Sequence, residues 1–356
     1  MDTSDLEITF DEEGICNHCR EYRKNLIHLR TEEDLKIEIN KIKKEGQGKK
    51  YDCIIGLSGG VDSSFVAYLV KKMGLRPLAV HLDNGWDTEL SVSNIERIIK
   101  VLDIDFYTYV VNWEEFRSLQ LSFLRASVAN IEIPTDHAIV AILYKKAVEL
   151  GIRYIIHGGN LKTEGVMPRA WGYDARDLRH LIAIHKKFGG IELKTFPMLG
   201  VWKLAYYSLL KRIKWFPILN YGDYDKTKAK ELLQKQLGWR DYSEKHEESL
   251  FTKFFQSYIL PKKFNIDKRK AHYSTLINSG QMTREEATEK MKYQPYPAGK
   301  EMQNDKDYVV KKLGLTTEEF DNIMSQPIKS YRDYPNHSLF IERLSFIYRF
   351  IKKIAI

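Results

Sequence analysis

The sequence predicts an α/β protein built on a parallel sheet, preceded by a short N-terminal segment with two cysteines and followed by a mainly helical C-terminal part. Three observations predict this class. Short apolar runs alternate with helix-like segments from Tyr51 to Gly158, a glycine-rich turn joins the first run to the first helix, and the pattern past residue 190 is mostly helical. Strands that alternate with helices of this length form parallel sheets, so we expect helices on both faces.

Each expected strand is a short apolar run, and each expected helix repeats its apolar residues at helical spacing. Residues 1–20 are irregular, and residues 21–48 are polar and helix-like. The expected strands are 52–57, 77–83, 106–111 and 154–158, and the expected helices are about 62–73, 88–102, 113–130 and 135–150. We expect three regions, 1–48, 49–190 and 191–356, with a hinge at Gly189-Gly190.

The composition is that of an ordinary globular protein, since 43% of the 356 residues are apolar and 29% are charged. No apolar run approaches the roughly 20 residues that a membrane-spanning helix needs, and the acidic N-terminus does not resemble a signal peptide. We therefore expect a cytoplasmic protein without a membrane partner, and three cysteines fit a reducing compartment. The net charge of +8 suits an anionic partner such as ATP, a nucleotide sugar or RNA. A lysine-rich solvated surface explains the charge equally well, so we do not expect a nucleic acid partner.

A glycine-rich turn between the first strand and the first helix carries the strongest chemical signal. It reads Ser58-Gly59-Gly60-Val61-Asp62-Ser63-Ser64. Paired glycines let the backbone approach a ligand, a helix start offers free N–H groups to an anion, and the serines add hydroxyl donors. The turn has neither the lysine of a Walker A loop nor the spacing of a dinucleotide-binding turn. It is typical of a phosphate-binding site.

Asp62 is the unusual residue of this turn, because a carboxylate beside a phosphate is repulsive unless a cation lies between them. Mg²⁺ bridging Asp62 and phosphate oxygens would remove the conflict. The alternative is an ordinary strand-to-helix turn with an Asp or Ser cap.

The string S-G-G-V-D-S-S after a strand resembles the PP-loop ATP pyrophosphatases, whose adenine nucleotide alpha hydrolase-like fold is Rossmann-like. The resemblance implies cleavage of ATP between the α and β phosphates, with transfer of AMP to an oxygen of the substrate. It also implies that Asp62 is catalytic through Mg²⁺. The loop residues implied to bind ATP are Ser58, Gly59, Gly60, Asp62, Ser63 and Ser64.

Further segments resemble a narrower family, the N-acetyl sugar amidotransferases of lipopolysaccharide, O-antigen and pseudaminic-acid biosynthesis. They include "DTSDLEITFDEEGICNHC" (2–19), "AVHLDNGWDTELSVSNI" (79–95), "IPTDHAIVA" (133–141), "IIHGGNLKTEG" (155–165) and a long block at 245–287. The resemblance implies that ATP activates the amide oxygen of an acetamido group and that ammonia displaces AMP, which gives an acetamidino group. It implies an acidic, nucleotide-linked sugar as substrate. It also implies a separate glutaminase, of the type that serves imidazole glycerol phosphate synthase, as the ammonia source.

Polar residues after the second strand and at the start of a later helix are further candidates for the active site. Asp83 and Asn84 are expected to bind ATP, and the alternative for Asp83 is an N-cap or turn residue. Trp86 and Thr135 are expected to contact the substrate. Asp136-His137, after Pro134, are expected to be catalytic, and the alternative is a capped helix start with an acidic first turn.

The end of the fourth strand supplies a second group. His157, Gly158 and Asn160 are expected to bind ATP, and Glu164 is expected to contact the substrate. A histidine at a strand end is often only a hydrogen-bonded core residue, but the adjacent glycines favour close approach of a ligand. Lys245-His246, which open the C-terminal block, are also expected to be catalytic. Five cations of this block could meet an acidic sugar or its diphosphate, and the alternative for any single one is a solvated surface charge: Lys253, Lys262, Lys263, Lys268 and Arg269.

Cys16-x-x-Cys19 has the spacing of half a four-thiolate zinc site, which makes structural Zn²⁺ a hypothesis. In the family that the chain resembles, a second such pair commonly lies just before the segment that begins this chain. Either the start codon is placed too far downstream here, or this member has lost the pair. Cys53 lies in the first expected strand and fits a small buried hydrophobe.

Two other functions stay open. One is a tRNA-modifying enzyme of the thiolase type, which usually needs reactive cysteines near its active site. The other is a non-catalytic nucleotide-binding adaptor, which would bind ATP and release no pyrophosphate.

Overall fold

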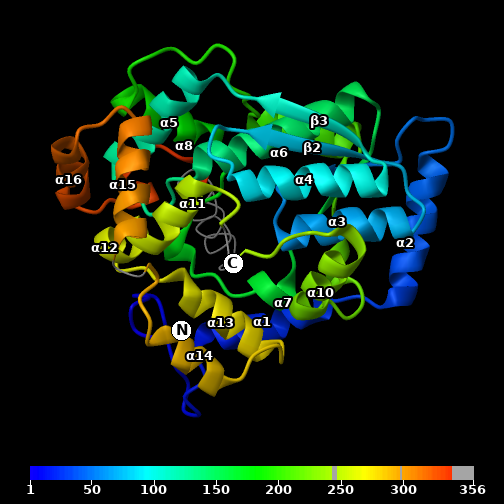
Figure 1. Ribbon diagram of the computed structural model, residues 1–356, viewed down its shortest axis with the longest axis horizontal. Helices are drawn as coiled ribbons and strands as arrows, with labels where there is room; N and C mark the ends of the chain where they lie inside the picture. The colour runs from blue at the N-terminus through cyan, green and yellow to red at the C-terminus, as the bar shows by residue number, and fades with distance from the viewer. Residues whose placement is uncertain (243–246, 297–298, 339–356) are drawn as a thin grey trace, which may run out of the picture.

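The structure is a computed structural model that describes residues 1–242, 247–296 and 299–338. At its centre lies a sheet of five parallel strands in the order β3-β2-β1-β4-β5 (Figure 1). The strands are β1 Cys53–Gly56, β2 Pro77–Asp83, β3 Asp105–Val110, β4 Tyr154–His157 and β5 Lys214–Pro217. The predicted α/β class is confirmed, and the four predicted strands match observed ones to within a residue at each end.

Helices occupy most of the remaining described chain, and many begin at a side-chain cap. Thr31, for example, accepts from the Asp34 amide while the Asp34 carboxylate accepts from the Thr31 amide. The helices up to the fourth strand are α1 Asn17–Asn25, α2 Glu32–Glu45, α3 Val61–Lys72, α4 Glu89–Leu102, α5 Trp113–Ala126 and α6 Ile133–Glu149. Those that follow are α7 Leu161–Glu164, α8 Leu178–Phe188, α9 Val201–Ala205, α10 Lys226–Leu237, α11 Leu250–Phe254, α12 Leu260–Phe264, α13 Lys268–Asn278, α14 Arg284–Met291, α15 Lys300–Lys312 and α16 Thr317–Ser325.

Helices cover both faces of the sheet, as β1 illustrates. Cys53 and Ile55 pack into one core cluster with residues of α2, α3, α4 and α10, whereas Ile54 packs into another with residues of α6. Successive side chains of a strand point to opposite faces, so this run of apolar residues buries both faces at once. All three side chains are fully buried.

The sequence did not indicate strand β5, which pairs with β4 in parallel and lies beyond the expected hinge at Gly189-Gly190. The sheet therefore extends into the region that we expected to be mainly helical. Its four residues, Lys-Trp-Phe-Pro, are too few to show an alternating pattern, and a lysine and a proline stand at the two ends.

The C-terminal helices pack against α5 and α8 in the largest core cluster. Phe116 and Phe123 of α5 lie in this cluster together with Phe254 of α11 and Phe320 of α16. The aromatic stripe of Phe251, Phe254, Phe255 and Tyr258, which fits the core by its helical spacing, is buried. In Figure 1 these helices lie beside the sheet, with α13 and α14 below it.

The N-terminal segment packs onto the C-terminal part. The Met1 amino group donates to Ser274 Oγ at 2.6 Å, and Lys270 forms an ion pair with Asp2 at 2.8 Å. Helix α1 lies against α13 (Figure 1). Among the described residues, no helix combines the length and the apolar character needed to cross a membrane.

Candidate active site

The glycine-rich loop lies between the end of β1 and the start of α3, at the carboxyl edge of the sheet. Gly59 adopts a φ of +81°, and a Cβ at this position would lie 2.7 Å from the carbonyl oxygen of Ser91. Both facts require glycine. Gly60 is the residue before α3, and a Cβ there would approach a carboxylate oxygen of Glu248 and the Ser58 hydroxyl at 3.4 Å. The loop therefore turns tightly against α4 and leaves its inner side open.

The loop serines differ in their surroundings. Ser58 Oγ and Ser63 Oγ lie 3.1 Å apart, and both residues line a cavity of about 260 Å³ in front of the loop. Ser64 is fully buried and donates to the carbonyl oxygen of Gly60 at 2.6 Å. The structure thus gives Ser64 a role in holding the turn, where we had expected an ATP contact, because its hydroxyl bonds back within the first helical turn.

Asp62 lines the same cavity at the start of α3. The Tyr224 hydroxyl donates to Asp62 Oδ1, and burial together with the charge of Asp62 raises the pKa of Tyr224. Gly158 also lines the cavity, but a Cβ there would lie only 3.0 Å from Asp62, so its close contact is with Asp62 and not with a ligand. These two contacts fix the position of the Asp62 carboxylate.

The charges around this cavity fit a phosphate that carries Mg²⁺. Four carboxylates line it, those of Asp62, Glu164, Asp241 and Glu248, together with Lys226 and with Lys230, which pairs with Asp241 at 2.8 Å. A bare polyphosphate would be repelled by these carboxylates, whereas Mg²⁺ is typically held by one or two carboxylates plus substrate phosphates. The described residues contain no group of three or more His, Cys, Asp or Glu that could hold a metal alone, so phosphate oxygens would have to complete the coordination.

Two aromatic residues that the sequence did not indicate hold the loop from the other side. Trp239 Nε1 donates to the carbonyl oxygen of Gly59 at 2.9 Å, and the Tyr242 hydroxyl donates to the same oxygen at 3.1 Å. Both side chains are buried and line the cavity. They follow α10 and belong to no motif, so only the folded chain reveals their contact with the loop.

A second cavity, of about 700 Å³, continues from the first along the carboxyl edge of the sheet. The two cavities share Ser58, Ser63, Glu164 and Glu248 as lining residues. Because the phosphate loop forms a wall of both, a group bound in the second cavity would lie next to a nucleotide bound in the first.

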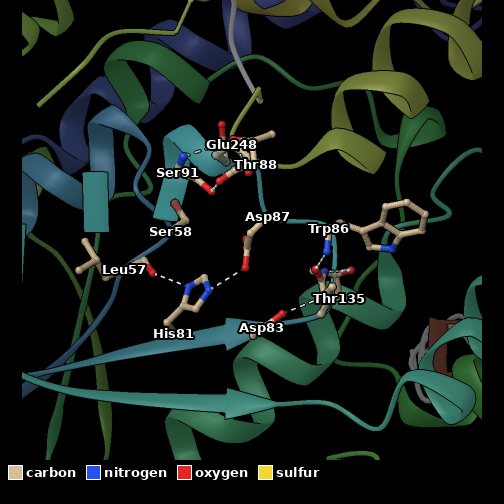
Figure 2. A network of polar contacts seen from close by, with 12 residues as sticks. Leu57, Ser58, His81, Asp83, Trp86, Asp87, Thr88, Ser91, Thr135 and Glu248 are labelled. Atoms are coloured by element: carbon tan, nitrogen blue, oxygen red, sulfur yellow. Dashed lines mark hydrogen bonds and ion pairs between the residues drawn. The ribbon is translucent and has the colours of Figure 1, made fainter. Parts of the chain in front are cut away.

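His81, at the end of β2, lines the second cavity and was missed at the level of the sequence. Figure 2 shows its ring between Leu57 and Asp87, with Nδ1 at 2.9 Å from the Leu57 carbonyl oxygen and Nε2 at 2.9 Å from Asp87 Oδ2. Both partners are acceptors, which favours the imidazolium. Burial acts to lower the pKa of His81, but the hydrogen bond and charge of Asp87 outweigh it, so the pKa is raised. His81 therefore ties the strand that precedes the loop to the segment after β2.

Three predicted residues line this cavity together. Asn84 Nδ2 donates to Thr135 Oγ1 at 3.3 Å, and Asn84, Thr135 and Asp136 all line the cavity. Asp136 is exposed where it lines the cavity. Desolvation and the nearby charge of Glu132 raise the pKa of Asp136 to about 7. A carboxyl group that titrates near neutral pH in a cleft is a candidate acid or base.

Several predicted site residues have other roles. His137 is buried, its Nδ1–H donates to the Ala175 carbonyl at 2.7 Å, and its Nε2 accepts from the Leu199 amide at 3.0 Å. Because both ring nitrogens are used by the backbone and burial lowers the pKa of His137, the structure does not support a catalytic role. Trp86 is 1% exposed and donates to Gln120 at 2.8 Å, so it packs in the core instead of contacting substrate.

The predicted ATP-binding residues at the ends of β2 and β4 also bond within the protein. Asp83 accepts the Gly85 amide at 2.9 Å in the turn after β2, which was its alternative role. The His157 ring packs against Trp215, and its Nδ1 accepts the Gly159 amide. Asn160 caps α7 by accepting the Thr163 amide at 2.9 Å. These three residues lie at the right edge of the sheet but bond within the protein, where we had expected ATP contacts.

The cysteine pair does not form a metal site with its described neighbours. Cys16 Sγ and Cys19 Sγ lie 3.4 Å apart, and Asn278 Nδ2 donates to Cys19 Sγ. The nearby His18 contacts Asp5 instead, with 2.5 Å between His18 Nε2 and Asp5 Oδ2. Across the described residues no third ligand joins the two thiols, so the zinc hypothesis is not supported. Lys245 and His246 lie outside the described residues.

Family models match both halves of this site. Residues 33–132 match the NAD synthase family, and residues 248–352 match the C-terminal domain of WbpG-like LPS biosynthesis proteins. The first match covers the phosphate loop, and the second covers the wall of the second cavity that includes Glu248 and Lys268.

Curated relatives and solved structures are more distant. The tRNA-specific 2-thiouridylase MnmA of Chlamydia abortus is 35% identical over 126 residues, which is 30% of this chain and 33% of that protein. MnmA of Moorella thermoacetica is 26% identical over 198 residues, half of each chain. The chain thus spans a third to a half of the length of these relatives. The structure of NMN synthetase from Francisella tularensis covers 72% of this chain and 95% of its own, at 16% identity and a TM-score of 0.30.

The parallel sheet and its phosphate loop define the chain as a PP-loop protein of the ATP-using superfamily. Its residues 248–352 match the C-terminal domain of WbpG-like lipopolysaccharide biosynthesis proteins. The two matches together support the resemblance noted from the motifs, that of a PP-loop superfamily member related to the lipopolysaccharide amidotransferases. ATP with Mg²⁺ is the cofactor pair of this superfamily.

We predict that Asp136→Asn stabilises the protein at pH 8 but not near pH 4. The pKa of Asp136 is raised to about 7, so the folded state disfavours its charge, and the resulting loss of stability grows as pH rises from 3.8 toward 7. Thermal unfolding at both pH values measures the effect. Glu12→Gln, on the exposed N-terminal segment, is the control and should change neither value. An equal effect of Asp136→Asn at both pH values would contradict the raised pKa.

We predict that Trp239→Phe weakens the use of ATP. Phenylalanine keeps an aromatic ring but leaves part of the indole space empty and removes the donor to Gly59, so the free energy of unfolding should fall by about 1–3 kcal/mol. The KM for ATP should rise as the loop becomes less restrained. Urea unfolding and the ATP dependence of AMP formation measure the two effects. Trp202→Phe, at a residue 86% exposed, is the control. An unchanged KM for ATP in Trp239→Phe would show that this contact does not position the loop.

Proposed function

We propose that the protein is an ATP-dependent amidotransferase that converts the acetamido group of an N-acetylated sugar to an acetamidino group. The sugar is acidic and nucleotide-linked, and the product serves surface polysaccharide, lipopolysaccharide or pseudaminic-acid (flagellin glycan) biosynthesis. The proposal includes a cytoplasmic location, where ATP and nucleotide sugars are found together.

The composition of the second cavity is the observation that carries the proposal. One wall is the carboxyl edge of the PP-loop sheet, with Ser58, His81 and Asp136. The other wall comes from the WbpG-like region and consists of Glu248, Ser249, Thr252, Gln256, Lys268 and His272. An acceptor bound there would face the nucleotide cavity on one side and the lipopolysaccharide-type domain on the other.

The reaction needs two displacements. The amide oxygen of the acetamido group attacks the α-phosphorus of ATP, and pyrophosphate leaves. Ammonia then attacks the amide carbon, the carbon–oxygen bond breaks, and AMP leaves with the former amide oxygen. Mg²⁺ bound with ATP would supply electrostatic stabilisation of the phosphates. The protein has to bring the two groups together, which the shared wall of the two cavities favours.

Asp136 is the group that we assign to proton transfer. Attack by ammonia produces a cationic nitrogen, which must lose a proton before or as AMP leaves. Because the pKa of Asp136 is raised to about 7, it is a stronger base than an ordinary carboxylate and still largely ionised above neutral pH. It lines the same cavity as Ser58 and Ser63 of the phosphate loop.

The proposed ammonia source is a separate glutaminase subunit of the imidazole glycerol phosphate synthase type. Free ammonium should replace it in an assay.

The tRNA-modifying function is the second candidate, because the curated relatives named above are tRNA thiouridylases. The cysteines weigh against it. All three cysteines are described, and none lines either cavity. Cys53 is fully buried in β1, and burial raises its pKa. A buried thiol of raised pKa is a poor nucleophile for sulfur transfer.

The proposed activity predicts AMP and pyrophosphate formation from ATP, Mg²⁺ and ammonium chloride in the presence of a diacetamido nucleotide sugar. Mass spectrometry should show a product in which one oxygen is replaced by NH. A panel of such sugars and free nonulosonic acids identifies the acceptor. AMP formed only with transfer RNA would favour the thiolase type, and ATP binding without AMP from any acceptor would favour an adaptor.

Asp62→Ala should abolish AMP formation while the protein stays folded, because the carboxylate at the phosphate loop would be lost. Circular dichroism and thermal unfolding check the fold, and the AMP assay checks the activity. Glu12→Ala, on the exposed N-terminal segment, is the control for an unrelated carboxylate. Wild-type turnover by Asp62→Ala would disprove the assigned metal role.

A further inference from the structure

The cations of the WbpG-like region have different environments, and most already have partners. Lys253 pairs with Glu301 at 2.7 Å and Asp305 at 3.2 Å, and Arg269 pairs with Asp267 at 2.7 Å. Lys263 donates to carbonyl oxygens at the end of α16, and Lys262 is exposed with its Nζ 4.5 Å from the centre of the Tyr258 ring. None of these four side chains lines either cavity of the site.

Lys268 is different, because it lies at the start of α13 and lines the second cavity. It is the only lysine or arginine among the described residues of that lining, beside the carboxylates Asp87, Glu132, Asp136, Glu164 and Glu248. Its ammonium group lies 5.7 Å from the centre of the Phe255 ring. Its charge acts on Asp136 from a distance and lowers the pKa of that carboxyl group, against the larger effects that raise it.

Two carboxylates and the imidazolium of the cavity are engaged with the protein. Asp87 accepts from His81 at 2.9 Å, and Glu132 accepts from Thr252 at 2.5 Å and Gln256 at 3.4 Å. An anionic group that entered this cavity would meet several negative charges and would be repelled unless it reached a cation. Lys268 offers that cation at the wall contributed by the WbpG-like region.

We infer that Lys268 determines specificity by binding an anionic group of the acceptor, a carboxylate or a phosphate, next to the amide that reacts. The inference rests on the proposed function, since it presumes that the second cavity holds the acceptor. A charge-assisted hydrogen bond to an oxyanion contributes more than a neutral one, so the contact selects anionic over neutral acceptors. The phosphates of ATP are the competing anion, but the first cavity has its own lysines, Lys226 and Lys230.

The test compares Lys268→Met with the matched variant Lys262→Met, which removes an exposed lysine from the same region. Two acceptors are used: an N-acetylated nucleotide-linked uronic acid, and its neutral counterpart with a hydroxymethyl group in place of the carboxylate. We expect Lys268→Met to raise the KM for the acidic acceptor about tenfold or more, as loss of a hydrogen bond to a charged group predicts. The KM for the neutral acceptor and for ATP should not change, Lys268→Arg should retain most of the affinity, and Lys262→Met should behave as wild type.

Calorimetric titration of each acceptor without ATP separates this inference from the proposed reaction. Weaker binding of the acidic acceptor by Lys268→Met supports the inference even if no amidine forms with any acceptor. In that case the proposed reaction is wrong, whereas the role of Lys268 in binding stands. Free and nucleotide-linked forms of the same sugars show whether the carboxylate or the diphosphate is the anion. A loss that is equal for acidic and neutral acceptors in both forms, a raised KM for ATP, or no binding of either acceptor by the wild type would overturn the inference.

Discussion

The tight turn at Gly59 is the constraint on which the rest of the site depends. Gly59 has a positive φ, and a Cβ at this position would lie 2.7 Å from the carbonyl oxygen of Ser91. The turn therefore leaves no room for a side chain. Trp239 and Tyr242 donate to the carbonyl oxygen of the same residue, so a segment after α10 holds the loop from the far side. Because the loop is fixed between α4 and these aromatics, its serines and Asp62 face a cavity of defined shape. The C-terminal region thus helps to build the phosphate site itself.

The acidic lining of the two cavities is the second determinant of what the site can do. Carboxylates such as Asp62 and Glu164 repel free anions. Phosphates would therefore bind together with Mg²⁺, and an anionic acceptor would need the positive charge of Lys268. Desolvation, with a further contribution from the charge of Glu132, raises the pKa of Asp136 into the range where it can accept a proton near neutral pH.

The sequence predicted the parts of the structure that are local. The strand, glycine-rich turn and helix around Asp62 follow from short-range patterns, and the first four strands were placed to within a residue. It could not show which polar residues at the edge of the sheet face the cavity. His137 and Asn160 occupy the expected segments, but the backbone groups of Leu199 and Thr163 use their side chains. Trp239, Tyr242 and Lys268 reach the site only through tertiary packing, and β5 is too short to give a pattern.

The central claim is that the acetamido oxygen is the group that ATP activates. The most direct measurement is to label that oxygen with a heavy isotope in a diacetamido nucleotide sugar and to analyse the AMP by mass spectrometry. The account predicts that the label moves to the phosphate of AMP in step with amidine formation. AMP without the label, formed while the sugar keeps its labelled oxygen, would contradict activation of the amide and would require a different acceptor.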